Sequence, residues 1–169
     1  MVRGRVLVAG EAEGPFVRLG APISFWGGVD PATGRVADPR HPDHGRSLAG
    51  AVLLMPEAVG SSSSSAIMLE LLRGGVAPAA VLMGRADAIL ALGVVVAREL
   101  GHPTIPVLEV DVEQLAEVRE GARLRVGAGG HIDVRPGPHP PDSPPTPAPS
   151  SPSGGRVPPS PSTPGPGLP

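Results

Sequence analysis

The middle of the chain alternates short apolar runs with stretches of helical periodicity, and this alternation limits the fold more than any other feature. Residues 51–55 (AVLLM) and 79–83 (AAVLM) are short, apolar and followed by turn residues, which predicts two buried strands. Apolar side chains recur on one face of residues 66–73, which predicts a helix ended by two glycines. Asp87 can cap a second helix that runs to about Leu100. Together with β-rich ends, this pattern indicates a compact α/β domain.

The flanking segments supply shorter elements. Residues 5–9 and 105–108 are apolar and rich in β-branched side chains, so each is expected to be a strand. Residues 111–120 predict a short helix with an acidic outer face. Residues 123–127 and 131–135 are expected to form a closing hairpin. The long stretch from 10 to 50 has little periodicity, and we expect an ordered, functional loop there.

The C-terminal part has a different composition. Residues 136–169 contain 15 of the 24 prolines and almost no large apolar side chain, and Asp142 and Arg156 are their only Asp, Glu, Lys or Arg residues. Such a segment cannot bury enough apolar surface to offset the entropy lost on ordering. We therefore expect one domain over 1–135 and a disordered, partly polyproline II tail over 136–169, which either solvates the domain or carries a docking motif.

Missing residue types narrow the chemistry. The chain has no Cys and no Lys, so it offers no thiolate ligands for an iron–sulfur cluster and no Schiff-base lysine. All 14 basic residues are Arg, the side chain best shaped to clamp carboxylate or phosphate. A net charge of −2 argues against a nucleic-acid partner. With no apolar run of spanning length and no signal-like N-terminus, we expect no membrane partner and a cytoplasmic location.

Five consecutive serines, Ser61–Ser65, lie between the strand at 51–55 and the helix at 66–73. Gly60 permits a tight turn, and Ser61 or Ser62 is placed to be the helix N-cap. The free N–H groups and positive end of a helix favour a carboxylate, a phosphate or an incipient alkoxide. The alternative is a capping serine followed by small filler residues.

Two further segments are candidates. Phe25 and Trp26 are two of the three aromatic residues, and beside Gly27-Gly28 they predict a pocket wall or a protein interface, with a core plug as the alternative. His41 and His44 are close to the spacing of a metal pair. Prolines on both sides of His41 argue against a helix that would align the two rings, so we expect a structural, interface or pocket-wall loop and no metal on this chain.

These blocks together resemble a known family. The order PISFWGGVDPxTG, DxxHPxHGxSxAG, VLLMP, GSSSSS and PAAVLM, covering about residues 6–107, is similar to the swivel domain of the aconitase X group. That group includes the small subunit of phosphomevalonate dehydratase and the corresponding part of cis-3-hydroxy-L-proline dehydratase. The resemblance implies a swivelling β/β/α fold and a hydro-lyase that dehydrates a hydroxy acid.

The resemblance also implies partners and residue roles. A Cys-bearing large subunit would form a heterodimer with this chain and carry the iron or iron–sulfur centre, and the substrate would be a small anion. Ser61 would be the proton acceptor, with Gly60, Ser62 and Ser65 contacting substrate. Family members often have Gly-Arg-Gly-Ser at this loop, whereas this chain has Ala58-Val59-Gly60-Ser61. The absent arginine motivates two alternatives, a non-catalytic binding or scaffold domain and a free-standing anion-binding domain.

Overall fold

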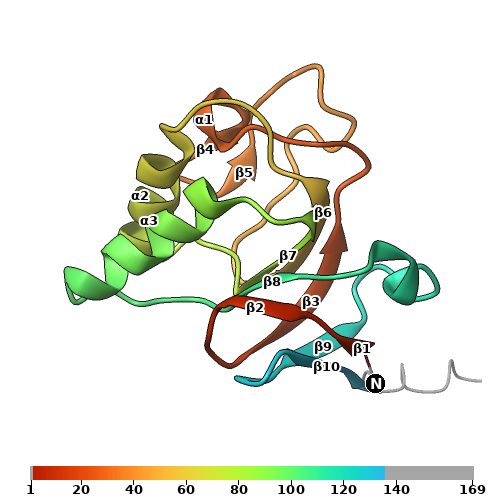
Figure 1. The fold of residues 1–169 in the computed structure, drawn as a ribbon. Coiled ribbons are helices and arrows are strands. Elements are labelled where there is room, and N and C mark those ends of the chain that lie inside the picture. Colours follow the sequence, from red (N-terminus) through yellow and green to blue (C-terminus); the bar gives the residue numbers. More distant parts are fainter. Residues whose placement is uncertain (1, 136–169) are drawn as a thin grey trace, which may run out of the picture. The chain divides into compact units, whose positions relative to one another are not determined.

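An eight-stranded mixed sheet organises the domain, and α2 and α3 pack together on one face of it (Figure 1). The computed structural model describes residues 2–135, so the predicted tail at 136–169 lies outside the described residues. The α/β class expected from the sequence is confirmed. The elements are β1 (Val2–Arg3), β2 (Arg5–Val8), β3 (Ala12–Arg18), α1 (Phe25–Gly28), β4 (Val29–Asp30), β5 (Arg35–Val36), β6 (Val52–Glu57), α2 (Ser64–Gly74), β7 (Ala80–Arg85), α3 (Ala88–Glu99), β8 (Val107–Glu109), the 3₁₀ helix η1 (Val112–Leu115), β9 (Arg123–Val126) and β10 (His131–Arg135).

The strand order is β1-β10-β9-β3-β6-β7-β8-β2. β3, β6, β7 and β8 run parallel to one another, and the remaining neighbours are antiparallel. β1 and β2 lie at opposite ends of this order although only Gly4 separates them in the chain. The Gly4 N–H donates to the Gly130 carbonyl at 2.8 Å, and the next residue, Arg5, pairs with Glu109. The N-terminal segment therefore bridges the two edges, and the sheet must curve round on itself.

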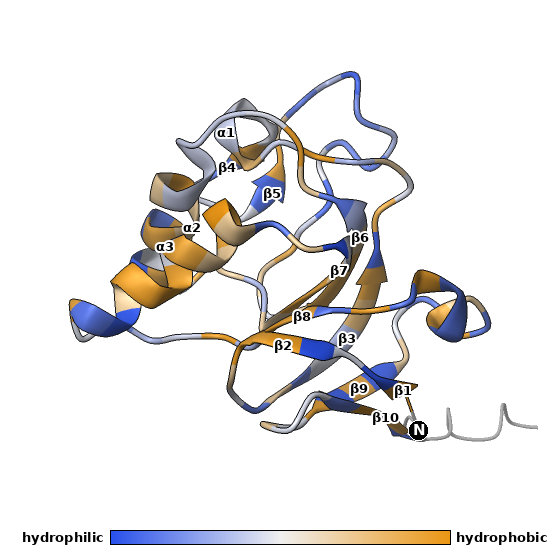
Figure 2. Ribbon diagram, in the orientation of Figure 1, coloured by the Kyte–Doolittle hydropathy of each residue, from blue (hydrophilic) through white to orange (hydrophobic). Residues whose placement is uncertain are grey.

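The central strands are buried on both faces. Leu53 and Met55 of β6 point to a core under α2 and α3, whereas Val52 and Leu54 point to a second core that contains Phe16. The first four positions of β6 and of β7 are therefore all buried, which explains their uninterrupted apolar runs. Helix α3 and strand β8 carry mostly apolar residues in Figure 2.

The two long helices pack closely. Helix α2 begins two residues before the predicted start, and Gly75 ends it in the left-handed conformation at φ 70°. Asp87 caps α3 as predicted, since its side chain accepts from the N–H groups of Ile89 and Leu90. Gly93 of α3 lies so close to α2 that a Cβ there would be 2.5 Å from the Ser65 carbonyl oxygen. The first turn of α2 is thus held against α3.

The expected irregular loop at 10–50 is the main correction to the sequence-based fold. It contains β3, α1, β4 and β5, and β3 lies inside the sheet between β9 and β6. Gly14 and Pro15 interrupt the strand pattern of β3 in the sequence, but residues 12–15 pair with β9 and residues 16–18 pair with β6, which holds the strand extended. The predicted helix at 111–120 was also wrong, because only η1 forms.

A distant arginine contacts the end of η1. The Arg18 guanidinium donates to the carbonyls of Leu115 and Ala116, and the Leu115 carbonyl also accepts from the Val118 N–H. The hairpin predicted at the C-terminal end is confirmed as β9 and β10. Within residues 2–135, no helix has the length and apolar character needed to cross a membrane.

Candidate functional site

Residues 58–63 connect β6 to α2, and Ser61–Ser63 form the second half of this connection, whereas Ser64 and Ser65 begin α2. The first half of this connection lies along the segment before α1. Ala58 forms a parallel bridge with Ile23, and the Val59 N–H donates to the Ile23 carbonyl at 3.0 Å. The approach to the serines is therefore fixed by a segment more than thirty residues earlier in the chain.

Gly60 is the residue at which the connection turns towards α2. Its φ of 97° lies in the region that favours glycine, and a Cβ there would be 2.7 Å from the Ser24 Oγ. Both the backbone conformation and the contact with Ser24 therefore require glycine at this position. The Gly60 backbone therefore packs against the Ser24 side chain, directly before Ser61 in the chain.

The serines are held by a local turn. The Ser63 N–H donates to the Ser61 Oγ at 3.1 Å, and the Ser64 N–H donates to the Ser61 carbonyl at 3.0 Å. The expectation that Ser61 or Ser62 is the N-cap was wrong, because Ser63 occupies that position and its side chain makes no capping hydrogen bond. The Ser61 side chain folds onto its own turn instead, as serine hydroxyls commonly do.

The other serines differ in exposure. Ser62 is exposed, and its carbonyl accepts a hydrogen bond from the Ser65 hydroxyl at 2.9 Å. Ser64 is buried, and its Oγ accepts from the Trp26 N–H at 3.4 Å. Ser64 therefore joins the start of α2 to α1, and no local pattern in the sequence assigns this contact to one serine of the run.

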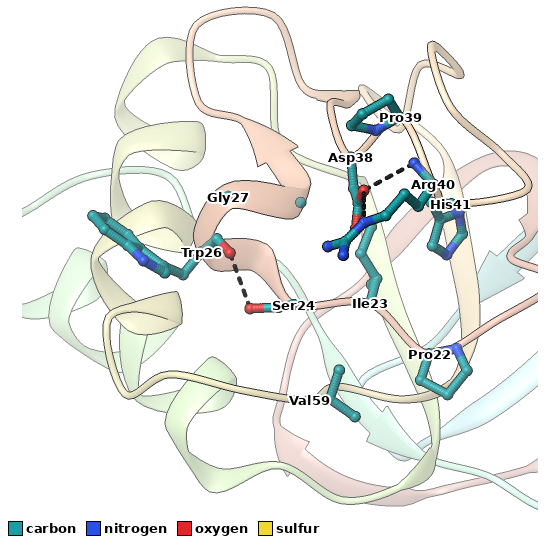
Figure 3. A pocket seen from close by; sticks show the side chains of 11 residues that line it. Pro22, Ile23, Ser24, Trp26, Gly27, Asp38, Pro39, Arg40, His41 and Val59 are labelled. Atoms are coloured by element: carbon teal, nitrogen blue, oxygen red, sulfur yellow. Dashed lines mark hydrogen bonds and ion pairs between the residues drawn. The ribbon is translucent and has the colours of Figure 1, made fainter.

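A cavity of about 530 Å³ lies beside this turn (Figure 3). It is built from three segments: the residues around α1, the loop after β5, and the connection after β6. Of the residues selected from the sequence, Trp26 and His41 line it, whereas Phe25, His44, Gly60, Ser61, Ser62 and Ser65 are not among its lining residues. The lining residues are Pro22, Ile23, Ser24, Trp26, Gly27, Gly28, Asp38, Pro39, Arg40, His41 and Val59.

The two aromatic residues of the PISFW block face in opposite directions. Phe25 is fully buried in the core under α2 and α3, whereas the Trp26 side chain is exposed, with a residue exposure of 57%. Trp26 also borders a second, largely apolar hollow with Val29 and Ile67. Trp26 is therefore a surface residue, and the alternative that it plugs the core does not hold.

His41 is a structural residue of the loop after β5. It is only 8% exposed, its Nε2 lies 3.2 Å from the Ala21 carbonyl, and its Nδ1 accepts from the Asp43 N–H at 3.1 Å. These two contacts fit the ring tautomer that carries its proton on Nε2. His44 is exposed on the same loop. In the part of the chain that the structure describes, no group of three or more His, Asp or Glu residues could hold a metal ion.

Three of the lining residues were missed by the sequence analysis: Ser24, Arg40 and Asp38. The Asp38 Oδ1 accepts from the Arg40 N–H at 2.9 Å and from the Arg40 Nε at 3.3 Å. These bonds, the one from the backbone N–H first, hold the pKa of the Asp38 carboxyl below its usual value. Arg40 follows the turn-forming Asp38-Pro39 in the sequence, which was the available signal. Arg40 is about twenty residues from the serines in the chain, so the sequence did not indicate that they lie near one another.

The chain is similar to known proteins in sequence and in fold. Residues 1–134 match the family "Aconitase X swivel domain". The chain is 37% identical over 134 residues to the phosphomevalonate dehydratase small subunit of Thermococcus gammatolerans, a match that covers 79% of this chain and 96% of the relative. It is 41% identical over 127 residues to the cis-3-hydroxy-L-proline dehydratase of Hypocrea jecorina, covering 75% of this chain and 21% of the relative.

The chain therefore spans about a fifth of the length of that hydroxyproline dehydratase. Among solved structures, the crystal structure of Thermococcus kodakaraensis aconitase X in its holo form superposes with a TM-score of 0.70 at 34% identity. That superposition covers 80% of this chain and 98% of the matched chain.

Proposed function

The chain belongs to the aconitase X swivel domain family, and we propose that it is the small subunit of a two-chain hydro-lyase that dehydrates a hydroxy acid. The observation that carries this proposal is the match to a dehydratase small subunit over 96% of that subunit's length. The swivel domain of the hydroxyproline dehydratase is one part of a longer chain, whereas the phosphomevalonate relative is a separate subunit.

We assign the proton-accepting role to Ser61. Dehydration requires a base for the proton on the carbon next to the carboxylate, and a serine hydroxyl is a poor base unless its negative charge is stabilised. The Ser63 N–H already donates to the Ser61 Oγ at 3.1 Å. Ser61 also lies just before the N-terminus of α2, where the helix dipole favours negative charge. Both interactions would stabilise the deprotonated Ser61 Oγ, which is the form that can accept the proton from carbon and become a hydroxyl again.

The leaving hydroxyl needs a Lewis acid, and a metal centre on the large subunit would supply it. This chain has no Cys, and residues 2–135 present no cluster of three potential ligands, so we place the iron or iron–sulfur ligands on the partner. Ser61 would then act on the substrate from the opposite subunit. Closure of the two subunits over the substrate would exclude water from the site.

Trp26 is the proposed contact with the large subunit. Its side chain is exposed between the 530 Å³ cavity and an apolar hollow, and Val59 across the cavity is also exposed, with 42% of its surface accessible. Exposed aromatic residues next to a polar site are typical of interfaces. The chain has a single Trp, so ¹⁹F NMR of 5-fluorotryptophan-labelled chain should show one resonance that shifts when the large subunit is added. An unshifted resonance in an assembled complex would contradict this interface.

The decisive experiment reconstitutes the chain with a Cys-bearing dehydratase large subunit and measures dehydration of phosphomevalonate and of cis-3-hydroxy-L-proline. Ser61→Ala should lower kcat by roughly 10²–10⁴-fold, the usual contribution of a positioned base. Ser63→Ala is the matched control, because the Ser63 side chain makes no capping hydrogen bond and the substitution keeps the N–H that donates to the Ser61 Oγ. Full turnover by Ser61→Ala would remove the proposed role of Ser61.

A second candidate function is a binding or scaffold domain that keeps the swivel fold without catalysis. The observation that favours it is Val59, an apolar side chain at the rim of the cavity directly before Gly60. In that case the chain would not co-purify with a dehydratase large subunit, and the reconstituted mixture would have no activity on either substrate. Activity that depends on Ser61 would exclude this alternative.

A further inference from the structure

We propose that Arg40 binds a second anionic group of the substrate, a phosphate or carboxylate remote from the reacting carbon. This inference rests on the proposed function, because it assigns the binding side of the same site. Arg40 and Val59 line one cavity although they are far apart in sequence. The chain therefore has a cation beside the serine turn that its local sequence does not provide.

Arg40 is the one Arg or Lys among the residues that line this cavity. Its side chain is 89% exposed, and its guanidinium points into the cavity in Figure 3. Only its Nε has a partner within residues 2–135, the Asp38 carboxylate, so both terminal nitrogens can donate to a ligand. A guanidinium can hold a carboxylate or a phosphate through two parallel hydrogen bonds.

Arg46 on the same loop shows the contrast. Its terminal nitrogens donate to the Arg18 carbonyl and to the carboxylates of Asp43 and Glu120. Arg46 is therefore used to hold the loop against the rest of the domain. Arg40 has a single carboxylate partner and an otherwise open guanidinium.

The Arg40 backbone is held in place, whereas its guanidinium is accessible to solvent. The adjacent His41 is buried and bonded through both ring nitrogens, and the Arg40 N–H donates to Asp38 at 2.9 Å. Asp38 also orients the guanidinium through Nε, so less side-chain entropy is lost when an anion binds. The His41 contacts therefore hold the backbone of the loop at Arg40 in position.

The geometry connects this anion site to Ser61. Ser24 lines the cavity, and its Oγ lies against Gly60, the residue before Ser61. A small molecule with one anionic group on Arg40 could extend past Ser24 towards the serine turn. The cavity volume of about 530 Å³ lies within the range of roughly 300–1,000 Å³ usual for small-molecule sites.

The first test titrates the full chain with inorganic phosphate, and separately with acetate, while backbone amide shifts are followed by NMR. Saturable shifts at Ser24, Gly28 and Val59 are expected, and Arg40→Ala should weaken them by about 10- to 100-fold. Arg73→Ala is the matched control, because Arg73 also pairs with a single carboxylate, Glu70, at 3.0 Å on an exposed face. Tighter binding of phosphate than of acetate would assign a phosphate, and the reverse a carboxylate.

Absence of saturable shifts with both anions, or binding by Arg40→Ala as tight as that of the wild-type chain, would overturn the inference. Ser61→Ala should keep wild-type anion binding, so this arm does not depend on catalysis. In the reconstituted enzyme, Arg40→Ala should raise KM about 10-fold or more with little change in kcat, and Arg40→Lys should recover part of the loss.

The two proposals can fail separately. If the reconstituted chain has no dehydratase activity but binds phosphate through Arg40, the proposed function fails and the anion site stands. If dehydration depends on Ser61 while Arg40→Ala leaves KM unchanged, the function stands and Arg40 has no part in substrate binding.

Discussion

Two consecutive strand-to-helix connections in this domain start from similar buried strands but differ in the groups that surround the helix N-terminus. β6 and β7 are adjacent, parallel and buried on both faces, and each leads to a helix on the same side of the sheet. The connection from β7 to α3 consists of residues 86–87, whereas the connection from β6 to α2 runs over residues 58–63.

In the short connection, carboxylates accept hydrogen bonds from the backbone N–H groups. Asp87 accepts from the N–H groups of Ile89 and Leu90 at 2.7 and 3.2 Å, and the Glu109 carboxylate accepts from the Ala86 N–H at 3.0 Å. Acidic side chains at a helix N-terminus also complement the helix dipole. This connection has its donors occupied by protein groups and is structural.

The long connection has no acidic side chain and no side-chain cap on its helix. Its first turn is held by hydrogen bonds to serine carbonyls and to the Ser61 Oγ. The N-terminus of α2 therefore lacks the carboxylate acceptor that α3 has. This difference would leave the positive end of α2 available to the charge that we propose on Ser61.

The largest expected effect on stability comes from the contact that joins the two units. In Gly93→Ala the new Cβ would lie 2.5 Å from the Ser65 carbonyl oxygen and 2.9 Å from the Met68 Cβ, so α3 must shift away from α2. We expect a loss of about 1–3 kcal/mol in the free energy of unfolding, measured with urea. Leu92→Ala on the exposed side of α3 is the control and should cost less. A neutral Gly93→Ala would contradict the close packing of the two helices.

Removal of the cap on the short connection should have the next largest effect. Asp87→Ala leaves the N–H groups of Ile89 and Leu90 without their side-chain acceptor and should lower the free energy of unfolding by about 1 kcal/mol. Urea unfolding measures this change, and Asp87→Asn, which keeps an acceptor oxygen, should recover most of it. Equal loss in both variants would show that charge rather than capping is responsible.

The equivalent substitution on the long connection should hardly change the free energy of unfolding. Ser63 is the N-cap of α2, but its side chain makes no capping hydrogen bond, so Ser63→Ala should change the free energy of unfolding by less than about 0.5 kcal/mol. The same urea experiment compares it directly with Asp87→Ala. A loss as large as that of Asp87→Ala would mean that the two connections are capped alike.

The smallest effect is a difference in pH dependence. The Ala86 N–H first, and then Arg5, lower the pKa of the Glu109 carboxyl below its ordinary value of 4.5. Because the folded pKa is the lower one, the contribution of Glu109 to stability is present above the ordinary value and is lost as the pH falls through the folded pKa. The serine connection contains no titratable side chain and should show no such change.

The measurement is urea unfolding of the wild-type chain and Glu109→Gln between pH 6 and pH 3. The stability difference between the two proteins should be largest above the ordinary value of 4.5 and should shrink as the pH falls. A difference that stays constant across this range would show that Glu109 acts only by packing.

The sequence predicted the parts of the fold that depend on neighbours in the chain. The strands around 51–55 and 79–83, the Asp87 cap and the C-terminal hairpin follow from local periodicity, capping and turn residues, and the structure confirms them. The blocks that resemble the aconitase X group predicted the family correctly. The roles of Ser61, Gly60, Ser62 and Ser65 stay predictions until the substitutions are made.

What the sequence by itself determined is the α/β class, the family and the serine turn, because each depends on residue types within a few positions of one another. The tertiary structure alone decided that β3 pairs inside the sheet despite Gly14 and Pro15, and that Ser63 rather than Ser61 is the N-cap. It also decided that Arg40 shares a cavity with Val59. These outcomes depend on contacts between segments far apart in the chain, whose free energies exceed local preferences and leave no local pattern to read.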